Sequence, residues 1–385
     1  MRLDSAEKLK PVRVLQVVNQ IDFGSGVCAV IWNYWEQMHP ERVVFDFLVH
    51  GDIDPKLAEI IRRRGCMIYQ MPSLKLRNLI VYQKALRCFF RCHKEYQIVH
   101  GNLANAAVFY LREAKKAGVP VRIVHAHLAK GVHRTVKDLR NFVLGRIGMY
   151  DANVYFACSK KAAVYAYGRK SRDCHLIKNA IDTDKFRFDQ KQRELYREKI
   201  GAGDALVLGH VGRFSAEKNH MYLLKILYAA KKQGIACKLL LVGDGKQRRQ
   251  IVRKIAEMGL KDDVIFTGMV EQTQGWLQVM DVFAMPSFVE GLPLAGIEAQ
   301  CSGLPCLFSD AVTREAKILD STRFLPAVDA CVQEWVNAAV RLRGTRTADA
   351  WRQVERCGYS IKKEAGRLEK FYIKQKCLKA KKGEK

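Results

Sequence analysis

The stretch ALVLGHVGRFSAEKN, residues 205–219, indicates the fold of this chain. Its first seven residues form a short apolar run that is typical of a buried strand. A turn with two cations, Arg213 and Lys218, follows this run, and an amphipathic helix begins near Asn219. A strand, a tight turn and a helix in this order predict one strand–helix unit of an α/β domain.

The same alternation extends in both directions from this stretch. The expected strands before it are 12–18, 43–49, 98–100, 121–126 and 153–158, and those after it are 238–242, 264–267, 281–284 and 305–308. Amphipathic segments separate these runs, so the pattern predicts parallel sheets that are covered by helices on both faces. A polar segment at 182–204 divides the two groups. We therefore expect an α/β fold with two Rossmann-like, doubly wound domains that face each other across a cleft.

Three segments are expected along the 385 residues of the chain. They are an N-terminal domain over residues 1–185, a second domain over 186–345 and C-terminal helices over 346–385. In the last segment, Ile361, Ala365, Leu368 and Tyr372 fall on one helix face, which predicts that this face is buried. Ligands of doubly wound domains bind beyond the carboxyl ends of the strands, so the cleft is the expected binding site.

The charge of the chain is strongly basic and unevenly distributed. The formal net charge is +27, and cations greatly outnumber acids between Arg62 and Arg146. Such a patch suits an acidic partner, which could be anionic lipid or an acceptor that carries a pyrophosphate. A generally basic, solvated surface is the alternative. We expect no nucleic-acid partner, because no recognised binding motif accompanies the charge.

Twelve scattered cysteines, several of them in apolar contexts, are typical of reduced thiols in a cytoplasmic protein. No signal peptide and no membrane-spanning apolar stretch are evident, so we expect a cytoplasmic or peripherally attached protein. No metal site is expected. The acid pairs Asp52/Asp54 and Asp182/Asp184 are common by chance, and Cys88, Cys92 and His93 lack a second ligand pair at zinc-like spacing.

The stretch PSFVEGLP, residues 286–293, places Glu290 in a loop, and Glu298 follows inside an apolar helical run. The helix N-terminus between the two acids attracts anions, and carboxylates accept hydrogen bonds from sugar hydroxyls. This combination suits a ligand with both phosphate and hydroxyl groups. Two carboxylates are also compatible with a glycosidase acid and nucleophile, although the surrounding sequence weighs against it.

A glycine-rich turn, Gly24-Ser25-Gly26, follows the first expected strand. Its amides could approach a phosphate group closely. The turn departs from the dinucleotide-binding fingerprint because Ala29 stands where a third glycine is usual. Asp46 or Asp52 could supply the acid of that fingerprint, so an NAD-dependent two-domain oxidoreductase stays open as an alternative.

These motifs together resemble the signature of retaining glycosyltransferases of family four, whose fold is called GT-B. The resemblance covers about residues 12–372 and is strongest between 211 and 309. It implies that Arg213 and Lys218 stabilise the departing diphosphate, that Glu290 contacts the donor sugar or phosphate, and that Glu298 binds the ribose hydroxyls. It further implies that the last helix crosses back onto the first domain.

The resemblance also implies roles for the other site residues. A histidine of the strand ending at 127 is expected to contact the donor sugar, with His127 preferred over His125. The expected catalytic residues are His127, Arg213, Lys218 and Glu290. The expected donor-binding residues are Gly24, Gly26, Arg213, Lys218, Gly243, Glu290, Gly291, Leu292, Pro293 and Glu298. The expected acceptor-binding residues are Asn19, Ser25 and His125.

The function implied by this resemblance is metal-independent transfer of a hexose, with retention, from a UDP- or GDP-sugar to an acceptor hydroxyl. The string around 291–306 is most similar to bacterial exopolysaccharide and capsule enzymes, which use lipid-linked acceptors at the inner face of the cell membrane. The nucleotide-sugar is a substrate, and no cofactor is expected. A catalytically inactive, lipid-binding relative is a further alternative.

Overall fold

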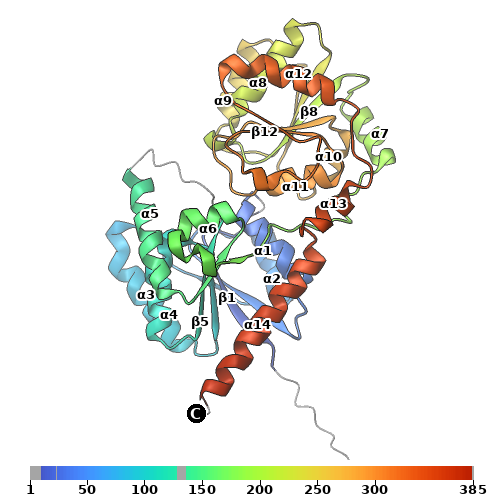
Figure 1. The fold of residues 1–385 in the computed structure, drawn as a ribbon. Coiled ribbons are helices and arrows are strands. Elements are labelled where there is room, and N and C mark those ends of the chain that lie inside the picture. The colour runs from blue at the N-terminus through green and yellow to red at the C-terminus, as the bar shows by residue number, and fades with distance from the viewer. Residues whose placement is uncertain (1–9, 23, 128–135, 384–385) are drawn as a thin grey trace, which may run out of the picture.

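The computed structural model describes residues 10–22, 24–127 and 136–383 (Figure 1). Two α/β lobes lie one above the other, and the last long helix runs across the first lobe. Each lobe contains one sheet whose strands are all parallel. The fold expected from the sequence is confirmed.

The first sheet has seven strands in the order β3-β2-β1-β4-β5-β6-β7. They are β1 (Val12–Val18), β2 (Val43–Val49), β3 (Ile68–Gln70), β4 (Ile98–Gly101), β5 (Val121–Ala126), β6 (Val154–Ala157) and β7 (His175–Leu176). The helices between them are α1 (Gly26–Gln37), α2 (Pro55–Arg63), α3 (Leu79–Cys92), α4 (Ala107–Lys116), α5 (Val136–Gly148) and α6 (Lys160–Tyr167).

The second sheet has six strands in the order β10-β9-β8-β11-β12-β13. They are β8 (Leu206–Val211), β9 (Cys237–Val242), β10 (Val264–Gly268), β11 (Val282–Met285), β12 (Cys306–Ser309) and β13 (Arg323–Leu325). The helices after β7 are α7 (Gln190–Lys199), α8 (His220–Lys232), α9 (Arg248–Glu257), α10 (Gln274–Val279), α11 (Leu294–Cys301), α12 (Val332–Leu342), α13 (Ala350–Arg356) and α14 (Ile361–Gly383), and the last of these lies on the first lobe.

Both faces of the first sheet are buried, which explains why its strands are apolar without strict alternation. Val14 packs with α1, α2 and α14 on one face, and its neighbour Leu15 packs with α3, α4 and α6 on the other. The expected boundary at residue 185 lies between β7 and α7, and that at residue 345 lies between α12 and α13; we propose both as domain boundaries.

The helix α14 completes the core of the first lobe. Tyr372 and Leu368 are buried against residues of β1 and β2, and the ring of Phe45 meets that of Tyr372 edge to face. Glu369 accepts hydrogen bonds from the side chains of His39 and Arg42. A segment more than 300 residues from β1 in sequence therefore supplies part of the apolar face that β1 needs.

The structure contains elements that the sequence pattern did not predict. The edge strands β3, β7 and β13 have two or three residues each, which is too short for a periodic signal. The helix α7 lies within the polar segment that was expected only to separate the two domains. It buries none of its residues, so hydrophobic periodicity could not identify it.

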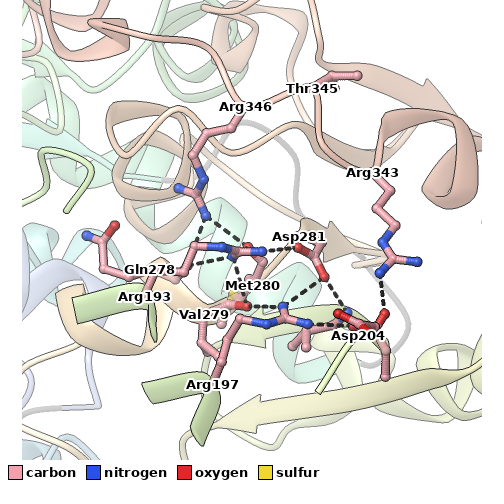
Figure 2. Close-up of polar contacts among 12 residues, drawn as sticks. Arg193, Arg197, Asp204, Gln278, Val279, Met280, Asp281, Arg343, Thr345 and Arg346 are labelled. Atoms are coloured by element: carbon pink, nitrogen blue, oxygen red, sulfur yellow. Dashed lines mark hydrogen bonds and ion pairs between the residues drawn. The ribbon is translucent and has the colours of Figure 1, made fainter. Parts of the chain in front are cut away.

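Arginines of α7 and of the segment after α12 gather at the carboxyl end of α10 (Figure 2). Arg193 and Arg346 both donate to backbone carbonyls at 278–280, which have no partner within the helix at its end. Asp281 accepts from Arg193 and Arg197 and also from the backbone of Val207 on β8. Burial lowers the pKa of Arg346 to about 9, and Arg193 acts in the same direction. Asp281 therefore balances closely spaced positive charges.

We predict that Asp281→Asn destabilises the protein by about 3–5 kcal/mol, because it leaves buried guanidinium groups without their carboxylate. Urea unfolding monitored by circular dichroism measures this change. Asp329→Asn is the matched control, because Asp329 is an exposed partner of Lys225, and such pairs contribute about 0–1 kcal/mol. Equal stability of the Asp281 variant and the wild type would contradict the role of Asp281.

Candidate active site

A cleft of about 1440 Å³ lies between the lobes and is lined by residues of both. The first lobe contributes the turn after β1 and the end of β5, together with residues of α5 and α6. The second lobe contributes the turns after β8, β9 and β10 and the loop that leads into α11. These are carboxyl ends of parallel strands, where doubly wound domains bind their ligands.

The two cations of the turn after β8 both line this cleft and are both paired with carboxylates. Arg213 Nη2 lies 3.4 Å from each carboxylate oxygen of Asp22, which belongs to the first lobe. Lys218 forms an ion pair with Glu290 of the loop before α11, and Ser287 Oγ donates to Glu290 at 2.9 Å. An anion that enters the cleft can therefore replace these carboxylates as the partner of the two cations.

Hydrogen bonds hold the turn after β8 and the loop before α11 together. The amide of Phe288 donates to the Glu217 carbonyl at 2.8 Å, and Asn219 Nδ2 donates to the Pro286 carbonyl at 3.1 Å. Asn219 has a φ of 54°, a left-handed conformation that asparagine tolerates better than most residues. Residues of these loops are therefore presented to the cleft as one unit.

Glu298 lies on α11 at the edge of the cleft, beyond Gly291, Leu292 and Pro293, which line the cleft as well. Burial raises the pKa of Glu298 from 4.5 to about 7. Thr273 Oγ1 donates to it at 3.5 Å and has the opposite effect on the pKa. Near neutral pH this side chain is thus close to the midpoint of its titration, so it can donate or accept hydrogen bonds.

The glycines of the cleft differ in why they are needed. Gly243 has a φ of 133°, and a Cβ there would lie 2.2 Å from the Gly212 carbonyl oxygen. Gly24 lies where the lobes approach, because a Cβ there would lie 3.3 Å from Met269 Cε. A Cβ at Gly26 would meet no atom within 4 Å. A side chain is therefore excluded at Gly243 and would be crowded at Gly24. At Gly26 no steric reason requires a glycine.

The two histidines at the end of β5 lie together in the cleft wall, with ring centroids 4.0 Å apart. His127 Nε2 lies 2.9 Å from Asn102 Oδ1, and His125 Nδ1 lies 3.1 Å from Nε2 of His100 on β4. Burial lowers the pKa of His127 to about 4, so this ring is neutral at physiological pH. Sequence reasoning missed His100 and Asn102, because a single polar residue in the short strand β4, or directly after it, gives no signal of its own.

The expected acceptor-binding residues are placed differently from one another. Ser25 lines the cleft and caps α1 through a hydrogen bond from the Cys28 amide at 3.4 Å. Asn19 is exposed and is not among the residues that line the cleft, so its acceptor-binding role stays a prediction. The chain after β1 first runs beside residues 52–54, where Ile21 pairs with Ile53, and it reaches the cleft only at Asp22.

Sequence and structure comparisons identify known proteins that are similar to this chain. Residues 205–344 match the family described as Glycosyl transferases group 1. The chain is 32% identical over 309 residues to the putative glycosyltransferase EpsF of Bacillus subtilis, covering 79% of this chain and 80% of that protein. The chain belongs to this glycosyltransferase family.

Other relatives of this glycosyltransferase extend the comparison. It is 25% identical over 314 residues to the UDP-Gal:alpha-D-GlcNAc-diphosphoundecaprenol alpha-1,3-galactosyltransferase of Escherichia coli, covering 77% of this chain and 80% of that enzyme. Its fold matches HepE of Anabaena, solved in complex with UDP-glucose, with a TM-score of 0.74 over 92% of this chain and 98% of that one at 16% identity. The fold is thus that of the GT-B enzymes, and the oxidoreductase alternative is set aside.

We predict that Glu298→Gln stabilises the glycosyltransferase at pH 8 and has little effect at pH 5. A carboxyl whose pKa rises on folding takes up a proton, so its contribution to stability falls as pH rises from about 4.5 to about 7. Glutamine removes this dependence. Melting temperatures at both pH values measure the effect, with the exposed Glu257→Gln on α9 as control. A pH dependence that is identical in both variants and the wild type would contradict the prediction.

Proposed function

We propose that this glycosyltransferase transfers a hexose, with retention at the anomeric carbon, from a UDP- or GDP-sugar to a hydroxyl of a lipid-linked saccharide. The observation that carries the proposal is the convergence of Arg213, Lys218, Glu290 and Glu298 on one cleft beside the N-terminus of α11. Two cations and a helix N-terminus suit a diphosphate, and two carboxylates suit the hydroxyls of two sugars. The name of the Escherichia coli relative supports a UDP-sugar and a lipid diphosphate acceptor.

The proposed chemistry breaks the bond between the anomeric carbon and the donor phosphate oxygen, and forms a bond from the acceptor oxygen on the same face. The acceptor proton passes to the departing phosphate oxygen. Negative charge builds up on the diphosphate as it leaves, and Arg213 and Lys218 stabilise it in a cleft that holds them in place beforehand. Glu298 accepts hydrogen bonds from the ribose, and Glu290 contacts the donor sugar once Lys218 turns to the phosphate.

The acceptor side of the cleft has the groups that a saccharide on a diphosphate would need. Phe142 of α5 and Tyr165 of α6 lie with ring centroids 5.4 Å apart, and both line the cleft. The guanidinium of Arg146 lies 5.3 Å from the Phe142 ring and also lines the cleft. Aromatic faces suit the apolar faces of sugar rings, and a guanidinium binds phosphate oxygens bidentately.

The same part of the first lobe carries a surface suited to a membrane. Leu139, Val143 and Ile147 recur at helical spacing along α5 and are 55%, 45% and 42% exposed. Basic residues lie on and around this helix, among them Arg140, Arg146, Lys160 and Lys161. Lys130 and Arg134 of the basic run lie outside the described residues, as does the side chain of Lys137. Among the described residues, none of the helices combines the length and the hydrophobicity that a membrane span requires. We propose peripheral attachment of a cytoplasmic protein to the inner face of the cell membrane, through α5.

We predict that Arg213→Ala and Lys218→Ala each lower kcat/KM about ten- to a hundredfold, because a lost charge-assisted contact costs about 1.5–3 kcal/mol. Release of nucleotide diphosphate from UDP- and GDP-sugars, measured with and without a saccharide acceptor, gives the rates. Lys225→Ala is the matched control, since this exposed cation of α8 pairs with Asp329 outside the cleft. Wild-type rates in both cleft variants would refute the proposed diphosphate site. Absence of turnover with every donor would favour the inactive relative.

We predict that binding to vesicles rises with anionic lipid content and falls steeply with salt, because each cation near the surface contributes about 1 kcal/mol and salt screens it. Co-sedimentation with phosphatidylglycerol and phosphatidylcholine vesicles measures this. Leu139→Asp with Val143→Asp should weaken binding, whereas Leu195→Asp on α7, which is 61% exposed in the second lobe, should not. Vesicle binding that ignores lipid charge, salt and the α5 substitutions would reject this membrane contact.

A further inference from the structure

The carboxylate of Asp22 and the guanidinium of Arg213 join the two lobes inside the cleft. Arg213 Nη2 lies 3.4 Å from each Asp22 carboxylate oxygen, and the Arg213 and Asp22 side chains are 44% and 32% exposed. The guanidinium also lies against Gly24, where a Cβ would be 3.4 Å from Nη2 and 3.5 Å from Nε. The turn after β1 therefore contacts the guanidinium through a carboxylate and through backbone that carries no side chain.

Asp22 has a second partner, which belongs to its own lobe. Gln20 Nε2 donates to Asp22 Oδ2, and Asn19 Nδ2 in turn donates to Gln20 Oε1 at 3.1 Å. Neither Gln20 nor Asn19 lines the cleft, so a ligand would leave these donors in place. Asp22 can therefore lose Arg213 and still keep a hydrogen-bond donor, which makes the exchange of its partner feasible.

The Asp22 carboxylate makes the kind of contact with Arg213 that a phosphate group would make. Carboxylate and phosphate oxygens both accept charge-assisted hydrogen bonds from guanidinium groups. Glu290 is related to Lys218 in a similar way, but these two residues belong to the same lobe, and their side chains are only 11% and 23% exposed. Asp22 differs from Glu290 because it reaches its cation from the opposite lobe and is more accessible to water.

The proposed reaction changes the charge that faces Asp22. Both phosphates of a nucleotide-sugar are esterified, whereas the terminal phosphate of the product has a free end whose second ionisation lies at about pH 6. The product therefore carries about one more negative charge than the donor at neutral pH. A fixed carboxylate in the cleft opposes the binding of both anions, and it opposes that of the product more strongly.

We propose that Asp22 is an internal competitor of the diphosphate for Arg213, which lowers the affinity for nucleotides and promotes release of the nucleoside diphosphate product. The identity of the nucleotide rests on the proposed function, whereas the competition for Arg213 requires only a diphosphate. Asp22 takes Arg213 back as the product leaves, so the guanidinium is never left without an anionic partner. Departure of product limits turnover in many enzymes, and a carboxylate in this position shortens that step.

Two other charged residues of the first lobe provide matched controls. Lys56 Nζ lies 3.5 Å from Glu271 Oε1, a second ion pair between the lobes, and Lys56 does not line the cleft. Glu59 is an exposed partner of Arg63 on α2, also outside the cleft lining. Lys56→Gln thus removes a contact between the lobes, and Glu59→Gln removes one negative charge, without changing the surroundings of Arg213.

Calorimetric titration of the full chain with inorganic pyrophosphate, UDP and GDP tests the proposal. Asp22→Asn keeps the shape of the side chain and should bind pyrophosphate and the preferred nucleoside diphosphate about tenfold more tightly, because competition and repulsion are both removed. Asp22→Glu keeps the charge and should stay near the wild type, as should Lys56→Gln and Glu59→Gln. Circular dichroism verifies folding, and Asp22→Ser replaces the asparagine variant if that variant misfolds.

The dependence on Arg213 separates competition from a general effect of charge. In the Arg213→Ala background, Asp22→Asn should change the affinity for pyrophosphate much less, because no guanidinium is left to compete for. An equal gain in that background, or pyrophosphate binding that is absent or no tighter in Asp22→Asn, would overturn the proposal.

Transfer assays supply a second readout. The nucleoside diphosphate should inhibit Asp22→Asn at about tenfold lower concentration than the wild type, while KM for the donor falls by a smaller factor. A raised KM for the acceptor with unchanged nucleotide affinity would assign Asp22 to the acceptor and overturn the proposal. Tighter pyrophosphate binding without any binding of UDP or GDP would count against the proposed donor and would still support the competition at Arg213.

Discussion

The two connections between the lobes are hydrogen-bonded to each other, and the cleft depends on this pairing. The amide of Ile181 donates to the Tyr359 carbonyl at 2.9 Å, and the amide of Ile361 donates to the Ile181 carbonyl at 2.9 Å. Asn179, close to the first crossing, donates at 2.6 Å to the carbonyl of Leu292 in the cleft loop. The two connecting segments, around Ile181 and Ile361, thus lie side by side and set the relative placement of the two sheets. A rotation of one lobe against the other has to bend both segments together.

The charges of the cleft follow from the same placement. Asp22 reaches Arg213 only because the lobes approach near Gly24, and the distance of 3.4 Å together with partial exposure of both groups makes this a weak pair. Lys218 and Glu290 are more deeply buried and lie within one lobe. A ligand diphosphate would therefore release the contact across the cleft easily, whereas it would have to compete with a better shielded carboxylate for Lys218.

The sequence predicted most of this architecture because its signals were local. The run at 205–219 shows strand, turn and helix in fifteen residues, and the long strands β1, β2 and β8 were expected within one residue of their ends. The helix α7 could not be predicted, because its stability depends on arginine contacts with residues about 85 positions away. Asn19 was expected at the site as a sequence neighbour of the glycine-rich turn, but the pairing of Ile21 with Ile53 directs the chain along residues 52–54 first, and Asn19 does not line the cleft. His100 and Tyr372 show the same limit, since their contact joins positions 272 residues apart.

The packing of α14 on the first lobe has a consequence for how the protein is made. During synthesis, β1, β2 and α1 leave the ribosome early, but the apolar face that they form with Tyr372 and Leu368 stays uncovered until the last helix follows. The second lobe, whose strands span residues 206–325, can form its core before that moment. Domains usually complete their folding from the N-terminus onward as the chain emerges. In this chain the second lobe can complete its core before the first. A nascent chain that stalls before residue 361 therefore exposes the apolar face of the first lobe to chaperones and to other unfinished chains.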